Sequence, residues 1–394
     1  MKVLSFGHIP TSVGGRQSSG LANVIYQLAL HIAKQEGYEM TLAATDVFVL
    51  KQRRGELTIL GWTKKLLLKY TLLHICTSLK VACNVIESKR KYRALVSVPG
   101  LFLKSMFLDY AIRKTCPDII HLHGAHSVLY QHLIPKRTKI VVTLHGNVGN
   151  DKNLPFHEIH AKMERFLCFS QRIDFMCTIS STIPVILKRM YGEIKSKYKV
   201  ILNAYDNTVF KYIEPIKHDK LTLCTIASFS KLKGQERVID ALKKSGCDYK
   251  YRCIGHITDS EKALLDEKAY NIDFEWLGVK KPTEIRDILA ECDYMILPSS
   301  SEGFGLVYLE AIACGVPIII PKELPLSLEG NILNGENAIR INGCDINAIT
   351  EVLPSLKDKK WDSHAVAQSV ISYTWDNISK EYCEVYSSLI HNKI

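Results

Sequence analysis

Residues 297–321, LPSSSEGFGLVYLEAIACGVPIIIP, run through the end of a strand, a polar loop, a short helix and a second strand. This order is half of a parallel α/β unit. Gly303 and Gly305 let the backbone approach a ligand closely, and the N–H groups at the start of the helix have no partner within it. The stretch therefore predicts an anion site at a helix N-terminus.

The helix in this stretch carries one charge, Glu310, among residues that are apolar on nearly every face. Such a helix is expected to be buried, and a buried carboxylate is costly unless hydrogen bonds satisfy it. A phosphate at the helix start, with ligand hydroxyl groups on Glu302 and Glu310, would satisfy the whole stretch. The alternative is a core helix in which a buried Lys or Arg pairs with Glu310.

Residues 301–317, SEGFGLVYLEAIACGVP, resemble the Glu-x7-Glu motif of retaining glycosyltransferases of family 4, which have the GT-B fold. The resemblance implies that Glu302 lies against the transferred sugar and that Glu310 binds the ribose hydroxyls of the nucleotide. It also assigns to the nucleotide-sugar site the residues between the two glutamates, Phe304, Gly305 and Leu306. A motif of this kind is a hypothesis that its structural context must support.

The first half of the chain has fewer stretches that resemble this family. Gly14 and Gly15 follow a first strand at 3–6, where ligands of open α/β sheets bind, and they resemble the glycine loop that lies against the donor phosphates. A solvated turn is the alternative. His145 ends a later strand and falls on the family's Thr-x-His-Gly histidine, which implies contact with the donor sugar. His121, His123 and His126 suggest a metal cluster only superficially, because no carboxylate or Cys accompanies them.

In the second half, Lys233 precedes a predicted helix and matches the lysine that clamps the nucleotide diphosphate in this family. An ammonium group suits a phosphate. Ser228 stands where the family has an arginine, and Lys231 cannot reproduce the two parallel hydrogen bonds of a guanidinium. The resemblance implies that residues 276–280 lie near the base. No Asp-x-Asp metal signature is present in these segments, so neither a metal nor a separate cofactor is required by this interpretation.

The composition limits the other possibilities. The twelve cysteines include no Cys-x-x-Cys, which predicts reduced thiols in a cytoplasmic protein. Lysines interrupt the apolar run at 57–86 before it reaches the length of a bilayer, and the start of the chain resembles a strand more than a signal peptide.

Charge is distributed unevenly along the sequence. Residues 1–199 hold 29 Lys and Arg against 12 Asp and Glu, and the window 51–114 alone holds 14 against 3. Leu and Ile alternate with Lys at helical spacing in this window. An anionic membrane surface on the inner face of the membrane is one partner that the pattern allows, and an ordinary amphipathic helix with a solvated basic face is the other. A nucleic-acid partner is not predicted, since no recognition module accompanies the charge.

These observations predict an α/β protein with two doubly wound, Rossmann-like domains that face a central cleft, and a C-terminal helix that crosses back to the first domain. The predicted domains are residues 1–205, with a crossing helix at about 372–394, for the acceptor, and 219–371 for the nucleotide sugar. The predicted function is the retaining transfer of a sugar from a UDP- or GDP-sugar to a carbohydrate or lipid-linked glycan acceptor, in cell-surface polysaccharide biosynthesis. The alternatives are a GT-B epimerase or hydrolase of sugar nucleotides, and a non-catalytic partner that binds sugar nucleotides for another transferase.

Overall fold

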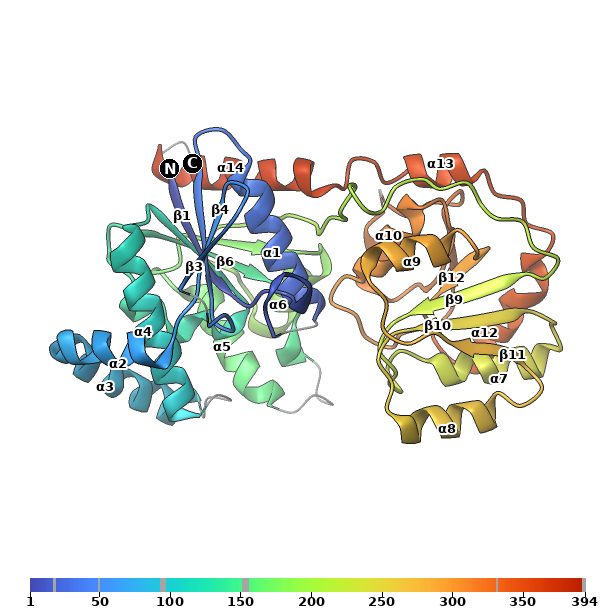
Figure 1. Cartoon of the computed structure of the whole chain (residues 1–394), viewed down its shortest axis with the longest axis horizontal. Helices are drawn as coiled ribbons and strands as arrows, with labels where there is room; N and C mark the ends of the chain where they lie inside the picture. Colours follow the sequence, from blue (N-terminus) through green and yellow to red (C-terminus); the bar gives the residue numbers. More distant parts are fainter. Residues whose placement is uncertain (17–18, 49, 93–96, 151–155, 331, 392–394) are drawn as a thin grey trace. The chain divides into compact units, whose positions relative to one another are not determined.

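The structure is a computed structural model, and it describes every residue except 17–18, 49, 93–96, 151–155, 331 and 392–394. The chain forms two compact units, one made of Met1–Asn203 and Trp375–Ile394 and the other of Ala204–Thr374 (Figure 1). Each unit is a sheet with helices, as the alternation of strands and helices predicted.

The sheet of the first unit has eight strands in the order β3-β4-β2-β1-β5-β6-β7-β8. All neighbours are parallel except β3 and β4. The chain order reverses at β1, which lies between β2 and β5, and ligands of open α/β sheets bind at such a reversal. The strands are β1 (Lys2–Gly7), β2 (Glu39–Ala44), β3 (Lys51–Arg54), β4 (Leu57–Leu60), β5 (Ile119–His123), β6 (Lys139–Leu144), β7 (Phe175–Thr178) and β8 (Tyr198–Val200).

The last helix of the chain belongs to the first unit, which confirms the predicted return of the C-terminus. It packs against α1, and the Tyr386 hydroxyl hydrogen-bonds to Nδ1 of His121 on β5 at 2.8 Å. The Tyr38 hydroxyl also donates to the Cys383 carbonyl oxygen at 2.8 Å. The helices of this unit are α1 (Gly20–Ala33), α2 (Lys64–Leu73), α3 (Ile75–Tyr92), α4 (Val98–Thr115), α5 (His157–Phe169), α6 (Thr182–Tyr191) and α14 (Trp375–Ile390).

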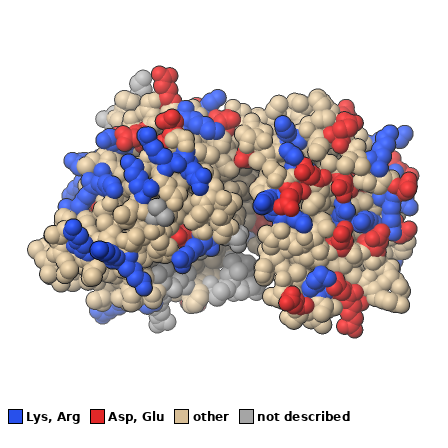
Figure 2. All heavy atoms as spheres, in the orientation of Figure 1, with Lys and Arg blue, Asp and Glu red and all other residues tan. Residues whose placement is uncertain are grey.

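The basic window forms two helices, α2 and α3, which end and begin on either side of His74. Among the described residues, no single helix is long and apolar enough to cross a membrane. The two helices reach that length and composition only together, and they are bent by 107° at their junction. Figure 2 shows a row of Lys and Arg side chains that crosses an otherwise uncharged area at the lower left, where α2 and α3 lie.

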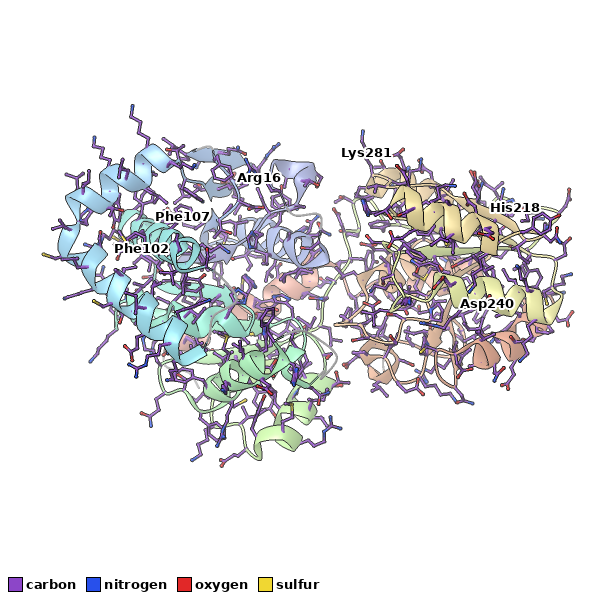
Figure 3. All side chains as sticks on the ribbon, turned by 90° about the horizontal axis from the view of Figure 1, so that it is seen from below. Arg16, Phe102, Phe107, His218, Asp240 and Lys281 are labelled. Atoms are coloured by element: carbon purple, nitrogen blue, oxygen red, sulfur yellow. The ribbon has the colours of Figure 1, made fainter. Side chains whose placement is uncertain are left out.

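Helix α4 lies between α2–α3 and the sheet. Its Phe107 is fully buried, and the ring lies 6.3 Å from the ring of Phe6 on β1. Figure 3 shows the labelled Phe107 on the inner side of the two outer helices. Helix α4 therefore supplies the apolar side chains that cover this part of the sheet. The outer faces of α2 and α3 are not needed for that cover.

The second unit has a six-stranded sheet in the order β11-β10-β9-β12-β13-β14, with parallel neighbours throughout. The strands are β9 (Thr222–Ile226), β10 (Lys250–Ile254), β11 (Asp273–Trp276), β12 (Tyr294–Ile296), β13 (Ile318–Pro321) and β14 (Ala338–Ile341). The helices are α7 (Gln235–Ser245), α8 (Asp259–Lys268), α9 (Pro282–Leu289), α10 (Leu306–Ala313), α11 (Pro325–Leu328), α12 (Ile346–Val352) and α13 (Ser363–Gln368). Here the strand order reverses at β9, between β10 and β12.

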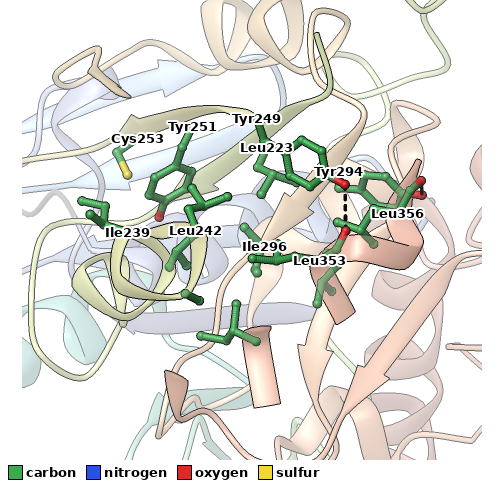
Figure 4. Close-up of a cluster of buried hydrophobic side chains, with 14 of the residues drawn as sticks. Leu223, Ile239, Leu242, Tyr249, Tyr251, Cys253, Tyr294, Ile296, Leu353 and Leu356 are labelled. Carbon is green, nitrogen blue, oxygen red and sulfur yellow. Dashed lines mark hydrogen bonds between the residues drawn. The ribbon is translucent and has the colours of Figure 1, made fainter. Parts of the chain in front are cut away.

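Buried tyrosines tie this second sheet to the chain that follows α12. The Tyr249 hydroxyl donates to the Leu353 carbonyl oxygen at 2.8 Å, and the Tyr294 hydroxyl donates to that of Leu356 at 3.0 Å (Figure 4). Both rings are at most 2% exposed. Because a buried hydroxyl must find a partner, these bonds fix where the segment after α12 lies on the sheet.

Candidate active site

The loops after β9 and β12 meet at the carboxyl edge of the second sheet, beside the reversal of strand order. The N–H of Ser300 donates to the carbonyl oxygen of Leu232 at 2.8 Å, which joins the two loops directly. This contact places the Glu302 loop next to the Lys233 loop. The strand order therefore brings together two motifs that are distant in the sequence.

Gly305 shapes the start of α10. Its φ is +87°, and a Cβ at this position would lie 2.6 Å from a ring carbon of Tyr308. The Tyr308 hydroxyl donates to the Leu297 carbonyl oxygen at 2.6 Å, which holds that ring in place. Only glycine suits both the φ and the close approach. The helix begins directly after it, and the N–H groups of Leu306 and Val307 are left without helical partners, while that of Tyr308 donates to the Gly305 carbonyl oxygen at 3.1 Å.

Helix α10 is less buried than its sequence predicted. Leu306, Val307 and Glu310 are each partly exposed on one face, while the opposite face, including Leu309, is fully buried. Phe304, in the loop before the helix, is also buried. An apolar sequence cannot show which face lacks a neighbour, because that depends on the elements packed around the helix.

Glu310 lies on the partly exposed face. Desolvation, together with a smaller contribution from the nearby Asp206 carboxylate, raises the pKa of its carboxyl to about 7. No basic side chain of the described residues makes an ion pair with Glu310, so the predicted alternative of a core ion pair is not what this part of the chain forms. Hydrogen bonds donated by a ligand stabilise the ionised form of a carboxyl whose pKa is raised. Glu310 is therefore suited to bind ligand hydroxyls.

Lys233 and Glu302 form an ion pair, with 2.5 Å between Nζ and Oε1. The Glu302 side chain is 11% exposed and the Lys233 side chain 29%. The structure thus brings together two residues that the sequence analysis assigned separately to the sugar and the diphosphate. Each has its charge balanced by the other.

Arg237, on the first turn of α7, holds the two loops together and was missed by the sequence analysis. Its guanidinium donates to the carbonyl oxygens of Lys231 at 2.7 Å, Leu232 at 3.3 Å and Pro298 at 2.6 Å. The first two belong to the Lys233 loop and the third to the Glu302 loop. The available signal was an arginine four residues after Lys233, but nothing in the sequence shows that its partners are backbone carbonyls.

Ser228 is exposed at the end of β9, where the family pattern expects an arginine. Its carbonyl oxygen accepts a hydrogen bond from Nε2 of Gln235 at 3.2 Å. Next to it, the ring of Phe229 packs edge-on against Trp276, with 6.0 Å between centroids. Lys231 is also exposed, and only its backbone takes part in the Arg237 contacts.

The glycine loop of the first unit requires its glycines and is held in place by hydrogen bonds. Gly14 has a φ of +98°, and a Cβ on Gly15 would lie 1.9 Å from the carbonyl oxygen of Ile9. Asp46 accepts hydrogen bonds from the N–H groups of Ile9 at 3.2 Å and Arg16 at 2.9 Å. Asp46, two residues beyond β2, is the second residue that the sequence analysis missed, although its place at a strand's carboxyl end was a usable signal.

Two buried histidine arrangements follow from the parallel pairing of β5 and β6. His123 hydrogen-bonds through Nε2 to the Ser5 hydroxyl and through Nδ1 to Nε2 of His145, both at 3.0 Å. Nδ1 of His145 is buried and has no hydrogen-bond partner among the described residues. Burial lowers the pKa of His145 to about 3, so the ring is neutral, and its free nitrogen could bind a ligand hydroxyl.

His121 differs, because both of its ring nitrogens have partners. Nε2 hydrogen-bonds to the Thr143 hydroxyl at 2.7 Å, and Nδ1 to Tyr386. Burial lowers its pKa to about 3 as well. No group of three or more His, Cys, Asp or Glu within the described ranges could hold a metal ion. His121 is therefore a core residue that joins β5, β6 and α14.

Two family models match the chain, one for each half. The model described as Glycosyltransferase Family 4 matches residues 18–208, and the model described as Glycosyl transferases group 1 matches residues 206–368. The chain belongs to glycosyltransferase family 4. This confirms the membership that the Glu-x7-Glu stretch predicted.

Curated relatives of this family-4 chain have different activities in their names. It is 30% identical over 237 residues to N-acetyl-alpha-D-glucosaminyl L-malate synthase of Bacillus anthracis, covering 56% of this chain and 60% of that one. An uncharacterized 41.2 kDa protein in the cps region of Klebsiella pneumoniae is 25% identical over 342 residues, 78% of this chain and 86% of the other. The O-antigen biosynthesis glycosyltransferase WclY of Escherichia coli is 24% identical over 299 residues, 69% and 79% of the two chains. The chain thus spans about three fifths of the first of these relatives.

Solved structures show the same fold. Sucrose-phosphate synthase from Thermosynechococcus elongatus matches with a TM-score of 0.75 and 13% identity, covering 100% of both chains. HepE from Anabaena, solved in complex with UDP-glucose, matches with a TM-score of 0.66 and 14% identity, covering 98% of this chain and 100% of that one. The GT-B fold predicted from the sequence is thereby confirmed.

Proposed function

We propose that this family-4 protein transfers a sugar, with retention of configuration, from a nucleoside-diphosphate sugar to a hydroxyl of a carbohydrate or lipid-linked glycan acceptor. The observation that carries the proposal is the Lys233–Glu302 pair on the loops that lead into α7 and α10. The names of the Klebsiella and Escherichia coli relatives support a place in cell-surface polysaccharide biosynthesis. UDP-glucose bound to HepE supports a UDP-sugar donor, and a GDP-sugar is the other donor to test.

The proposed donor site lies in the second unit. As the bond from the sugar to the diphosphate breaks, negative charge grows on the departing oxygen. The Lys233 ammonium and the N–H groups of Leu306 and Val307 at the start of α10 would stabilise that charge. Stabilisation that grows as the bond breaks lowers the barrier rather than merely tightening binding.

Glu302 and Glu310 would hold the two sugars of the donor. Glu302 is nine-tenths buried and would accept hydrogen bonds from the hydroxyls of the transferred sugar, while Glu310 would accept them from the ribose. The acceptor oxygen then bonds to the anomeric carbon on the face that the diphosphate leaves, which retains the configuration, and the proton of the acceptor hydroxyl passes to the departing diphosphate oxygen. Phe304 and Gly305 form the turn between Glu302 and helix α10, and this turn sets the position of Glu302 relative to Glu310.

We assign acceptor binding to the first unit. The family resemblance also assigns two groups of this unit to the donor: His145, with its free Nδ1, to the transferred sugar, and the glycine loop at Gly14 and Gly15 to the phosphates. A neutral imidazole can donate or accept one hydrogen bond at Nδ1 without changing the charge of the unit.

Two alternatives predict different outcomes when the protein is incubated with a donor. An epimerase or hydrolase of sugar nucleotides would use the donor pocket without a sugar acceptor. A non-catalytic partner is favoured by one observation, the exposed Ser228 in place of the family's arginine. The non-catalytic alternative does not explain why the Lys233 and Glu302 loops are held together by the Arg237 contacts, since binding alone does not need that arrangement.

The test is a donor screen followed by product analysis. UDP-, GDP- and ADP-sugars are compared by thermal shift, and the stabilising donor is incubated with and without lipid-linked and free glycan acceptors. We expect nucleoside diphosphate release that depends on the acceptor, together with a glycosylated product of retained configuration. A changed sugar nucleotide, free sugar without acceptor, or binding with no turnover would each favour one of the alternatives instead.

A further inference from the structure

Helices α2 and α3 expose an unusual amount of apolar surface. Leu72, Leu73, Ile75 and Leu79 surround the bend at His74 in sequence, and each is 60–70% exposed. Two more apolar side chains on the same helices, Leu68 and Ile86, are also 60% exposed or more. Residues spaced by four and seven, such as Ile75, Leu79 and Ile86, share one face of a helix. We call residues 64–91 the α2–α3 elbow.

Basic side chains accompany this apolar surface. The elbow contains seven Lys and Arg residues and one acidic residue, Glu87. Lys64, Lys65, Lys69 and Lys80 are exposed, and none makes an ion pair with a residue that the structure describes. On α2 the leucines at 68 and 72 alternate with these lysines along the exposed side. The outer surface is therefore both apolar and strongly positive (Figure 2).

The inner sides of both helices are committed to the fold. Leu67, Tyr70, Val81 and Val85 are buried, and both helices pack against α4. The Tyr70 hydroxyl donates to Asp109 on α4, and this hydrogen bond helps to fix α2 on that helix.

A second α4 residue fixes α3 on the same layer. Arg113 contacts Asp109 at 2.9 Å and the hydroxyl of Thr77 at 3.2 Å. The elbow is thus a fixed part of the first unit, and its exposed leucines and isoleucines contribute little to the core.

We propose that the α2–α3 elbow docks the protein on an anionic lipid bilayer, with its apolar side chains in the headgroup region and its lysines on lipid phosphates. Lysine interleaved with leucine and isoleucine is the composition of helices that lie in a membrane interface. Protein–protein interfaces are depleted in lysine, which makes a protein partner the poorer fit. The 107° bend and the buried inner faces direct the elbow onto the bilayer rather than through it.

Nucleic acid fits less well, because single-stranded binding relies on exposed aromatic side chains. Tyr70 is the aromatic residue on α2 and is buried against α4. The charge of the elbow would instead act on the negative surface potential of the bilayer, which extends about a Debye length, roughly 8 Å at physiological salt. Binding should therefore have a salt-sensitive part from the lysines and a salt-insensitive part from the apolar side chains.

The experiment is vesicle flotation of the full chain without donor or acceptor, so that its outcome is independent of the proposed glycosyl transfer. Vesicles of phosphatidylcholine with about one third phosphatidylglycerol are compared with pure phosphatidylcholine at low and physiological salt. The charge variant changes Lys64, Lys65, Lys69 and Lys80 to Gln. The matched control changes four exposed lysines elsewhere, Lys195, Lys197, Lys217 and Lys243, to Gln and so has the same net charge.

A third variant, Leu72→Ser with Ile75→Ser and Leu79→Ser, removes the apolar part. We expect the unsubstituted chain and the matched control to float with anionic vesicles, the charge variant to bind at least about 100-fold more weakly, and the apolar variant to lose the binding that survives high salt. Because all the changed side chains are exposed, unchanged melting temperatures should show that each variant folds.

Three results would overturn the proposal. The first is no flotation of the unsubstituted chain with anionic vesicles at low salt. The second is equal binding to pure phosphatidylcholine, or an equal loss in the matched control, because then neither anionic lipid nor this surface would be responsible. The third is a dimer in light scattering that the apolar variant abolishes while vesicle binding is absent, which would assign the surface to a second copy of the chain.

Discussion

Polar groups gather at the carboxyl ends of the central strands in both units, but with opposite electrostatic character. In the second unit the groups are charged, with Lys233 paired to Glu302 and with Glu310 on α10. In the first unit the groups that end β5 and follow β6 are histidines, His123 and His145, whose pKa burial lowers far enough to keep them neutral. The charged region can respond to a charge that forms during a reaction, while the neutral one offers hydrogen bonds at constant charge.

The largest effect should come from breaking the charged pair. Lys233→Ala is expected to lower kcat by about 10²–10³-fold, as the loss of one preorganised donor to a growing charge does elsewhere. Glu302→Gln should also lower kcat, and the double variant should lose less than the two single effects combined, because each single change leaves a partner uncompensated. Steady-state kinetics of the four proteins measure the coupling.

Lys231→Ala is the matched control for this cycle, since Lys231 is an exposed lysine on the same loop. Its kcat should stay near that of the unsubstituted enzyme. If Lys233→Ala turned over donor normally and Lys231→Ala did not, the diphosphate would be assigned to the wrong lysine.

The next effect concerns Glu310. Because the pKa of its carboxyl is raised to about 7 and ribose hydroxyls would bond to the ionised form, nucleotide affinity should rise with pH through 7, and binding near pH 7 should release a proton. Calorimetry in buffers of different ionisation enthalpy measures that release. Glu310→Gln should abolish it and weaken binding about 10–100-fold, the equivalent of about 1.5–3 kcal/mol for a charge-assisted hydrogen bond. Unchanged affinity and proton release in this variant would remove Glu310 from the site.

The neutral histidines make a smaller, pH-dependent contribution to stability. The pKa of His121 is about 3 in the folded chain and about 6.5 when unfolded. Its contribution is fully present above pH 6.5 and is lost as the pH falls, by about 1 kcal/mol for each pH unit. The melting temperature should therefore drop between pH 7 and pH 5. His121→Gln should melt lower at pH 7 but show a shallower pH slope, and an equal slope in both proteins would contradict this origin.

The smallest effect is expected from Ser228→Arg. An exposed strand-end serine leaves room for a guanidinium, which could add two parallel hydrogen bonds to a phosphate. Donor affinity, measured by calorimetry with the nucleoside diphosphate, should rise severalfold. Ser228→Lys is the matched control and should rise less. An unchanged affinity in both variants would mean that a basic side chain at position 228 does not reach the donor phosphates, and that the site functions with serine there.

Local patterns in the sequence predicted much of the fold. Alternating strands and helices predicted the two sheets, and the apolar return helix near the end predicted the helix that rejoins the first unit. The glycines at 303 and 305, the lone Glu310 and the family motif pointed to α10 before any contact was known. These predictions succeeded because strand burial, turn glycines and helix starts depend on a few neighbouring residues.

The sequence by itself determined the family of the chain, and it predicted which groups act, namely Glu302, Glu310, Lys233 and His145. Only the tertiary structure decided that Lys233 and Glu302 meet, because they are 69 residues apart and their loops join through β9–β12 adjacency and Arg237. It also decided which face of α10 stays accessible and that the basic window bends at residue 74. The physical reason is that burial and long-range hydrogen bonds depend on what packs against a segment, and the segment's own sequence does not contain that information.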